Sequence, residues 1–196
     1  MYIPKAFAET DPDRLRAFIR QHGFGTLVTH TTGGVHISHV PMQLSGDTLV
    51  GHLAAANPQC EHLKAGAAAV CIFQGPHAYV SPTWYTNPGV PTWNFTAVHA
   101  SGPATAITEP GLLREHVEAL AEQYESTRED PWTPDYPDSM LGAIVGFRVS
   151  IEALEGKFKL SQNRPAADRR GVIDALECSE SGADAALAAM MRGREP

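Results

Sequence analysis

Residues 155–164, EGKFKLSQNR, place an unusual density of polar side chains at the end of an extended segment. In an extended chain successive side chains point to opposite faces. The polar face carries Lys157, Lys159, Ser161 and Asn163, and the apolar face carries Phe158 and Leu160. Ammonium and hydroxyl groups on one face suit a phosphate dianion, because charge-assisted hydrogen bonds are stronger than neutral ones. The alternative is a solvated strand end with incidental lysines.

Pro165 follows this segment and is typical of the first position of a helix. The sequence predicts a helix over 165–176, with Asn163 or Arg164 at its cap. The first N–H groups of such a helix would point toward the same place as the lysines, and helix N-termini favour anions. The combination predicts a phosphate site.

Residues 51–59, GHLAAANPQ, form a second candidate. Three alanines followed by Asn57 and Pro58 at a predicted helix start let the backbone approach a flat ligand closely and present N–H groups to it. The alternative is an ordinary strand-to-helix corner with Asn57 as the N-cap. The two interpretations are compatible, because a capping residue can also contact a ligand.

His39 and His52 lie on predicted strands that we expect to be neighbours, flanking one site. They could donate hydrogen bonds to a ligand or bind a metal. His36 and His39 are three residues apart, which on a strand places them on opposite faces. No carboxylate or cysteine cluster accompanies these histidines, so we predict no metal site.

An aromatic group lies in and beside the proline-rich segment 81–95, SPTWYTNPGVPTWNF. Its rings could cover a flat ligand, close a dimer interface or fill an ordinary core. Prolines favour sheet edges, so we expect the segment at a rim. Asn94 is the polar exception and could contact a ligand edge. The aromatic residues are Tyr79, Trp84, Tyr85, Trp93 and Phe95.

The composition excludes several classes of protein. The chain has 196 residues and a formal net charge of -7, which disfavours direct DNA binding because that binding depends on neutralising phosphates. No apolar run approaches the length that spans a bilayer, and the N-terminus does not resemble a signal peptide. Three cysteines without CxxC spacing predict no disulfide framework. We therefore expect a cytoplasmic protein without a membrane segment.

The predicted elements favour an α+β fold that is mainly antiparallel. The first three strands are separated by turns too short for parallel crossovers, so we expect them to form a meander. Many short strands favour a closed or partly closed barrel with peripheral helices. We expect a main domain over 1–176 and a helical or frayed tail over 177–196. The predicted strands are 25–31, 35–42, 48–54, 68–75, about 78–85, 92–107 and 143–151, and the predicted helices are 11–23, 57–66, 108–124 and 165–176.

Six motifs in register resemble the FMN-binding negative transcriptional regulators of the PaiB type, from Met1 to about Asp174. The resemblance implies a split β-barrel related to pyridoxamine-phosphate-oxidase-like flavoproteins, and a homodimer with FMN at its interface. It also implies a role in regulating protease and sporulation genes. The motifs are MYIPKAF (1–7), SHVPM (38–42), GHLAAANPQ (51–59), FQGPHAYVSPTWY (73–85), VPTWNFTAVHASG (90–102) and EGKFKLSQNR (155–164).

Three departures from the family pattern stand out. Only TNPG (86–89) remains where the family carries a longer loop, Phe95 replaces a usual tyrosine, and HGF (22–24) replaces NPF. The resemblance also implies that the strand-to-helix turn after GHL (51–53) corresponds to the turn that holds the flavin phosphate and ribityl chain in related split barrels. The predicted FMN-binding residues are His39, Pro41, His52, Leu53, Ala54, Asn57, Trp93, Asn94, Lys157, Lys159, Ser161, Gln162, Asn163 and Arg164.

Three functions remain open at this point. The first is a regulator that acts through bound flavin or a partner. The second is an FMN-dependent oxidoreductase, such as a flavin reductase or a pyridoxamine-phosphate-oxidase-like enzyme, since the flavin itself carries redox chemistry. The third is a haem-binding or haem-degrading split barrel. No nucleophile with an attendant base and no paired carboxylates point to hydrolysis.

Overall fold

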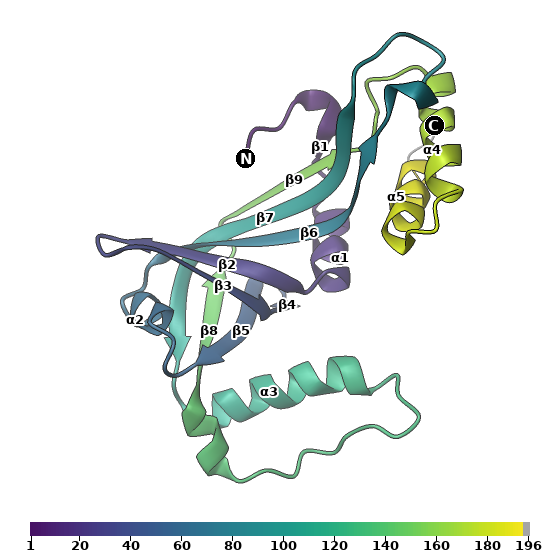
Figure 1. The fold of residues 1–196 in the computed structure, drawn as a ribbon. Coiled ribbons are helices and arrows are strands. Elements are labelled where there is room, and N and C mark those ends of the chain that lie inside the picture. The colour runs from purple at the N-terminus through teal and green to yellow at the C-terminus, as the bar shows by residue number, and fades with distance from the viewer. Residues whose placement is uncertain (194–196) are drawn as a thin grey trace. The chain divides into compact units, whose positions relative to one another are not determined.

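The computed structural model describes residues 1–193 (Figure 1). These residues fall into two compact units. The first unit contains residues 1–18, 74–98 and the described residues from 155 onward. The second unit contains residues 19–73 and 99–154. Strands β6 (Ala68–Val80) and β7 (Thr92–Ile107) contribute residues to both units.

The remaining elements follow the predicted order closely. The other strands are β1 (Ala8–Glu9), β2 (Phe24–Thr31), β3 (Gly34–Pro41), β4 (Gln43–Ser45), β5 (Thr48–Ala54), β8 (Ile144–Ser150) and β9 (Ala153–Lys159). The helices are α1 (Pro12–Gln21), α2 (Gln59–Lys64), α3 (Pro110–Glu125), α4 (Ala166–Glu177) and α5 (Gly182–Arg192), with 3-10 turns η1 (Lys5–Phe7), η2 (Pro82–Trp84) and η3 (Asp138–Ala143). No helix within residues 1–193 has the length and apolar character needed to cross a bilayer.

The strands form a mainly antiparallel sheet, which confirms the predicted fold class. Their order is β3-β2-β6-β7-β8-β5-β4, and β9 pairs with both β7 and β1. The neighbouring strands β2 and β3 pair in antiparallel register from Phe24 opposite Pro41 to Thr31 opposite Gly34. Within the described residues the two end strands of this order, β3 and β4, do not pair, so the sheet stays open.

The predicted meander of the first three strands is wrong. Strand β3 pairs with β2, whereas β5 pairs with β4 and β8, so β3 and β5 are not hydrogen-bonded neighbours. Pro41 ends β3 and has no N–H with which to extend a ladder. The next N–H, of Met42, donates to the carbonyl of Gly23 at 2.8 Å. The chain therefore leaves one ladder here and enters another.

The predicted strand over about 78–85 is correct only as far as Val80, because β6 ends there and the turn η2 follows. The side chain of Ser81 accepts a hydrogen bond from the N–H of Thr83, and Pro82 stands at the start of the turn. Proline and a capping serine both favour a helical turn over an extended strand at this position.

The predicted apolar face of EGKFKLSQNR is confirmed, since Phe158 and Leu160 are buried. Phe158 packs against Phe18 of α1 with ring centroids 5.1 Å apart. Helices α4 and α5 pack against each other in the first unit, and α5 reaches the strand residue Asn94, whose amide nitrogen lies 3.6 Å from the sulfur of Met191. The C-terminal helices therefore complete the core behind β7.

Helix α3 closes a smaller core of the second unit. Ile107, Leu113 and Leu141 form its centre. Gly146 of β8 makes this close packing possible, because a Cβ there would lie 2.9 Å from the side chain of Leu113. The helix therefore lies over the outer face of β5 and β8, the face that carries His52 opposite Gly146.

Candidate functional site

A cavity of about 140 Å³ in the first unit brings together four of the predicted FMN-binding residues. It lies where β9 ends and the chain turns toward α4. Small-molecule sites usually have volumes of roughly 300–1,000 Å³, so this cavity fits one polar group of a ligand rather than a whole cofactor. It is lined by Tyr85, Val90, Thr92, Lys159, Ser161, Asn163 and Arg164.

Lys159 supplies an ammonium group at the end of β9. Its Nζ donates to the hydroxyl of Thr92 and to the carbonyl of Trp93, each at 2.6 Å. Burial, followed by the nearby charge of Lys157, lowers the pKa of Lys159 from its ordinary value. Lys159 is half-buried, and a partly desolvated cation gains stability from an anionic ligand, because the ligand offsets the loss of hydration.

Ser161 does not continue the strand alternation. It has a φ of 62°, which is the left-handed region that non-glycine residues rarely adopt, and its side chain is buried. Its hydroxyl accepts a hydrogen bond from the amide of Asn94 at 2.9 Å. A strained, buried serine on the wall of a polar cavity is typical of a ligand site.

Arg164 is held by a buried carboxylate, Asp168, with which it forms an ion pair at 2.9 Å. Asp168 is fully buried and accepts hydrogen bonds from the backbone and side chains of Thr86 and Asn87 at 2.9–3.1 Å. Burial raises the pKa of Asp168, but these hydrogen bonds outweigh it, so the pKa lies below its ordinary value. Asp168 therefore stays ionised and orients the guanidinium.

The guanidinium of Arg164 also lies 4.0 Å from the ring centroid of Tyr85, and it donates to the carbonyl of Pro88 at 3.3 Å. Gly89 leaves space beside it, since a Cβ there would lie 2.5 Å from the guanidinium and 2.6 Å from the ring of Tyr85. The shortened 86–89 loop thus anchors the arginine. The Nε of Arg164 is buried and has no hydrogen-bond partner within residues 1–193.

These groups fit a phosphate. Two cationic, three hydroxyl-bearing and one amide side chain line a cavity of the size of a single charged group. Arginine and lysine make charge-assisted hydrogen bonds to phosphate oxygens, and a guanidinium that is already oriented loses little freedom on binding.

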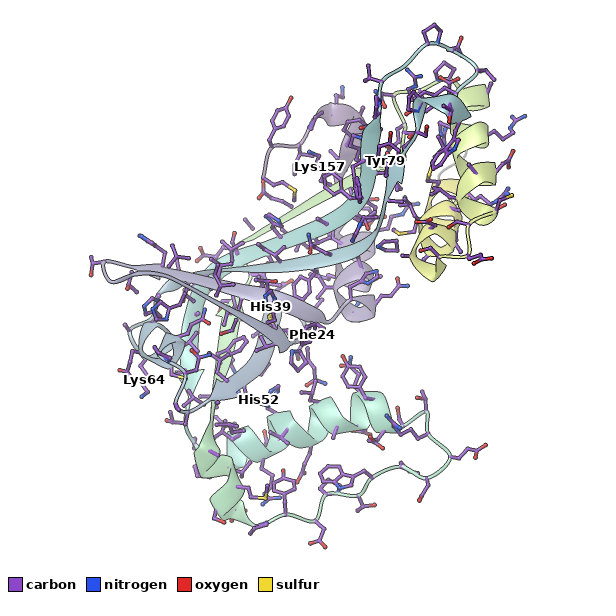
Figure 2. All side chains as sticks on the ribbon, in the orientation of Figure 1. Phe24, His39, His52, Lys64, Tyr79 and Lys157 are labelled. Atoms are coloured by element: carbon purple, nitrogen blue, oxygen red, sulfur yellow. The ribbon has the colours of Figure 1, made fainter. Side chains whose placement is uncertain are left out.

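The other predicted residues of the first unit have different surroundings. Gln162 folds back on the backbone, accepting from the N–H of Leu160 at 2.7 Å. Lys157, labelled in Figure 2, donates to the carbonyl of Tyr2 and lies 5.2 Å from the ring of Phe95. Asn94 is fully buried, and its Oδ1 lacks a hydrogen-bond partner among the described residues.

Trp93 and Tyr79 expose about half of their side chains and face each other edge to face, with centroids 6.3 Å apart. The indole N–H of Trp93 donates to His77 at 3.3 Å. Aromatic side chains with exposed faces can cover a flat ring system. The ring of Tyr85 instead lies against the guanidinium of Arg164. The predicted aromatic group therefore includes exposed rings that can cover a flat ligand and one ring that positions an arginine.

In the second unit Asn57 lies in a polar network at the start of α2. Its side chain accepts from the N–H of Gln59 at 2.9 Å and donates to the hydroxyl of Ser38 at 3.0 Å. Gln59 is fully buried and donates to Leu27, Thr29 and His36. The network ties α2 to β2 and β3. The N-cap of α2 is Pro58, so the interpretation of Asn57 as the N-cap is wrong by one residue.

The histidines predicted to flank one site have separate partners. His39 is exposed and bonds to the hydroxyl of Thr26 at 3.0 Å. His52 is half-buried, burial lowers its pKa, and its Nδ1 lies 3.2 Å from Nε2 of His116 on α3. Of the remaining predicted residues, Leu53 is buried in the core, Ala54 is exposed at the end of β5, and Pro41 is half-buried at the end of β3.

Sequence reasoning missed Asp168, Thr92 and His116. The spacing of Arg164 and Asp168, four residues apart at a predicted helix start, is a signal for the ion pair. Thr92 directly precedes Trp93 and Asn94, which the sequence did predict to contact FMN. His116 gave no signal, because its partner is 64 residues away in the chain.

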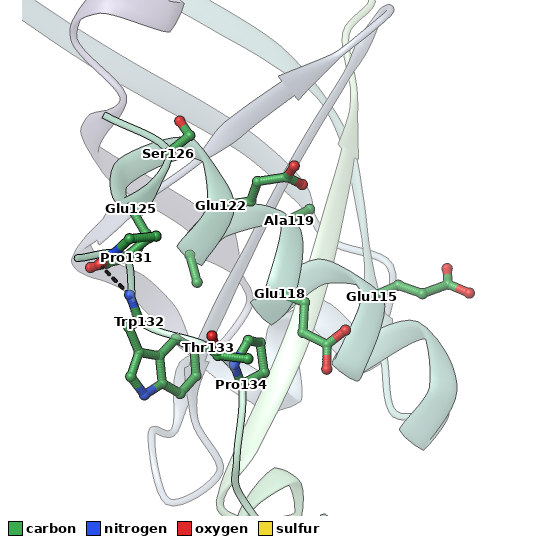
Figure 3. Close-up of a pocket in the computed structure, with 11 residues that line it drawn as sticks. Glu115, Glu118, Ala119, Glu122, Glu125, Ser126, Pro131, Trp132, Thr133 and Pro134 are labelled. Atoms are coloured by element: carbon green, nitrogen blue, oxygen red, sulfur yellow. Dashed lines mark hydrogen bonds between the residues drawn. The ribbon is translucent and has the colours of Figure 1, made fainter. Parts of the chain in front are cut away.

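A larger cavity, of about 590 Å³, lies between α3 and the loop that follows it (Figure 3). None of the predicted FMN-binding residues lines it. Four glutamates and Trp132 line this cavity. The negative charges of the glutamates repel a phosphate dianion, so they disfavour its binding there. The glutamates are Glu115, Glu118, Glu122 and Glu125. Size alone therefore does not identify the FMN site.

Comparison with known proteins gives one family and a consistent fold. The family described as "Putative FMN-binding domain" matches residues 1–153. The "Protease synthase and sporulation protein PAI 2" of Bacillus subtilis is 36% identical over 203 residues, which cover 99% of this chain and 98% of that protein. The alignment with PAI 2 therefore includes the cavity residues 159–164, which lie beyond the family match.

Two solved structures share the fold at low sequence identity. The FAD and heme binding protein from Mycobacterium smegmatis has a TM-score of 0.66 at 16% identity, covering 83% of this chain and 78% of that one. A "Putative Pyridoxamine 5'-phosphate oxidase" from Listeria innocua has a TM-score of 0.50 at 14% identity, covering 74% of this chain and 95% of that one. These likenesses confirm the predicted split-barrel fold.

Proposed function

The chain belongs to the family of FMN-binding domains that includes the sporulation protein PAI 2, and from this premise we propose that the cavity at Lys159 and Arg164 holds the phosphate of FMN. Membership of this family confirms FMN as the predicted cofactor. When bound, FMN supplies the redox chemistry, while the protein positions the flavin and controls access to it.

The observation that carries the phosphate proposal is the arrangement around Arg164. Asp168, Tyr85 and Pro88 each orient the guanidinium, and its Nε still lacks a hydrogen-bond partner among the described residues. The Asp168 carboxylate balances only one of the two cations beside the cavity, because Lys159 bonds to neutral groups. One uncompensated positive charge remains for an anionic ligand.

The test compares FMN with riboflavin, which is the same molecule without the phosphate. We expect Arg164→Ala to weaken FMN binding about 10-fold to 100-fold, the range of a charge-assisted hydrogen bond, and to leave riboflavin binding nearly unchanged. Arg170→Ala, at an exposed position of α4, serves as the matched control. Equal losses for both flavins, or no loss for FMN, would place the phosphate elsewhere. Flavin fluorescence titration measures both affinities.

The other predicted contacts form the remainder of the proposed FMN site. Trp93 would cover the flavin ring with its exposed indole, and the turn from Leu53 to Asn57 would present backbone N–H groups to the cofactor. Single substitutions to alanine at Trp93 and Asn57 test these contacts in the same titration.

We further propose a homodimer that uses the outer face of β2, β3 and β6. Alternate residues of β3 leave Val35 and Ile37 more than half exposed, and Phe24 of β2 is 67% exposed. Val28 lies between Ile37 and Val70 in the paired register, so the apolar residues are contiguous. A face of this kind is typical of a protein interface. His39 and Phe24 lie on neighbouring strands (Figure 2) and share this face by the paired register. His39 would then meet FMN at the interface.

Light scattering tests the dimer. We expect the wild type to be a dimer and Ile37→Lys to be a monomer, because a buried unpaired charge is costly at an interface. Val90→Lys is the control, since Val90 is 75% exposed and lies outside the face. A monomeric wild type, or an Ile37→Lys variant that remains dimeric, would exclude this face.

The proposed role is that of a cytoplasmic negative regulator of transcription in bacteria, acting through the bound flavin or a protein partner. PAI 2 is a sporulation protein, and a net charge of -7 disfavours direct contact with an operator. Three free cysteines agree with a reducing compartment. An FMN-loaded protein that keeps its flavin absorbance under anaerobic NADH and NADPH supports this role. Rapid bleaching would replace it with a flavin reductase.

A further inference from the structure

A second cavity of about 380 Å³ lies in the second unit, between α3 and the strands β4, β5 and β8. Its volume falls within the range of small-molecule sites. Its apolar wall is formed by Leu44, Val50, Ile107, Leu112 and Ala119. None of the predicted FMN-binding residues lines it, so the family's cofactor does not account for it.

Two charges of opposite sign line this cavity without partners. Arg148 is exposed on β8, where it pairs in register with Val50 of β5, and Glu115 is exposed on α3. Within residues 1–193 neither side chain makes an ion pair or a hydrogen bond. Many other charged side chains of α3 are paired, as Arg114 is with Glu118. A cation and an anion left free beside one apolar wall match a ligand that carries both charges.

His116 supplies the independent observation. Its side chain lines the same cavity and is only 6% exposed. Its Nε2 lies 3.2 Å from Nδ1 of His52, while its Nδ1 is buried and has no hydrogen-bond partner in the described part of the chain. Burial and the neighbouring His52 lower the pKa of His116 to about 4, so the ring is neutral at pH 7.

A neutral imidazole carries one proton on either nitrogen. If Nε2 holds the proton, Nδ1 is an acceptor; if His52 donates to Nε2, then Nδ1 is a donor. Both tautomers leave a buried hydrogen-bonding group unsatisfied, which is unfavourable unless a ligand or water meets it. A histidine that lines the cavity therefore has an unmet hydrogen bond, and two free charges line the same cavity.

We propose that this cavity binds an apolar α-amino acid, with the ligand carboxylate on Arg148, the ammonium on Glu115 and the apolar side chain against Val50, Ile107 and Leu112. The carboxylate suits the planar fork of a guanidinium. The proposal depends on the second unit alone and stands whether or not the first unit holds the FMN phosphate.

Calorimetric titration of the full-length protein with L-leucine is the first test. We expect saturable binding of L-leucine. Three analogues each lack one feature: 4-methylpentanoate has no ammonium, 3-methylbutylamine has no carboxylate, and glycine has no apolar side chain. Each should bind at least about 10-fold more weakly, the loss expected for one charged contact or one buried side chain. Failure of leucine, valine, methionine and phenylalanine to bind, or an analogue that equals leucine, would overturn the proposal.

Substitutions locate the binding. Arg148→Gln and Glu115→Gln should each weaken L-leucine binding at least about 10-fold, while Arg170→Gln should leave it unchanged. Both cavity residues are exposed and unpaired, so we expect the variants to keep the wild-type melting temperature. Leucine affinity that does not respond to Arg148→Gln would place any binding elsewhere and overturn the assignment.

Nitrogen-15 NMR of the histidine rings gives a readout that is independent of affinity. Saturating L-leucine should shift the imidazole resonances of His116 and leave those of exposed His30 unchanged. Substitution of each histidine assigns its resonances. Saturable binding without a shift at His116 would show that the ligand does not reach this wall.

Discussion

Two arginines line two cavities, and their surroundings differ in kind. Arg164 is anchored by a fully buried carboxylate, an aromatic ring and a backbone carbonyl, whereas Arg148 is exposed without a partner among the described residues. An anchored guanidinium has lost most of its rotamer freedom before a ligand arrives, so little further entropy is lost on binding. A free one loses that entropy on binding. The first arrangement suits a resident cofactor, and the second suits a weaker, exchangeable ligand.

The largest expected effect removes the anchor of Arg164. Asp168→Ala leaves a guanidinium and four hydrogen-bond donors without their acceptor, so we expect the melting temperature to fall by on the order of 10 °C and FMN binding to be lost. Asp174→Ala, at an exposed position of the same helix, should leave both unchanged. A thermal scan of the two variants measures the difference. An Asp168→Ala protein with wild-type stability would show that the carboxylate does not organise the pocket.

The second largest expected effect is the pH dependence of the stability of the second unit. The pKa of His116 is about 4 in the folded protein and near 6.5 in the unfolded chain, so between these values the unfolded state binds more protons. Stability is therefore fully present above pH 6.5 and is lost as the pH falls toward 4. The loss is on the order of 2–3 kcal/mol.

Urea unfolding of the wild type and of His116→Asn at pH 7 and pH 4.5 isolates this contribution. The asparagine variant cannot titrate there, so its stability should fall less between the two pH values. Identical pH dependence in both proteins would mean that His116 titrates in the folded state as it does in the unfolded chain.

A smaller effect tests the geometry of Arg164 rather than its charge. Arg164→Lys keeps the cation but loses the stacking on Tyr85 and the planar fork, so FMN affinity should fall by about 1 kcal/mol. This loss should be smaller than that of Arg164→Ala. If lysine binds FMN as well as arginine does, the orientation imposed by Asp168 has no consequence for the cofactor. Fluorescence titration with FMN measures it.

The smallest effect concerns the other arginine. Arg148→Gln should change the free energy of unfolding and the FMN affinity by no more than about 0.5 kcal/mol, as expected for an exposed side chain without partners. Equilibrium unfolding and FMN titration check both values. A larger loss of stability would show that Arg148 contributes to the fold and would remove the contrast with Arg164.

Local patterns predicted much of the molecule. Alternation in EGKFKLSQNR identified Phe158 and Leu160 as buried, because a half-buried strand segregates its two faces. The same rule failed at Ser161, where the strand has ended and the backbone has a positive φ. The Ser161 side chain nonetheless lines the predicted cavity, because the turn redirects it.

Local sequence patterns did not predict which distant residues or strands pair with each other. Turn chemistry indicated that successive strands are antiparallel, but not that Pro41 would separate β3 from β5 into different ladders. The pairing of His52 with His116 and the hydrogen bonds of Thr86 and Asn87 to Asp168 join residues 64 to 82 positions apart. No periodicity within one element encodes a partner in another.

The sequence by itself determined the mainly antiparallel fold class, the family with its FMN, and the cationic strand end, since these depend on local alternation, turn residues and motifs in register. Only the tertiary structure decided which charges are free. Arg164 and Arg148 are the same residue type, so the sequence alone does not distinguish them. The pKa, orientation and hydration of a charged group depend on what folding buries beside it. Folding buries Asp168 beside Arg164 and leaves Arg148 exposed.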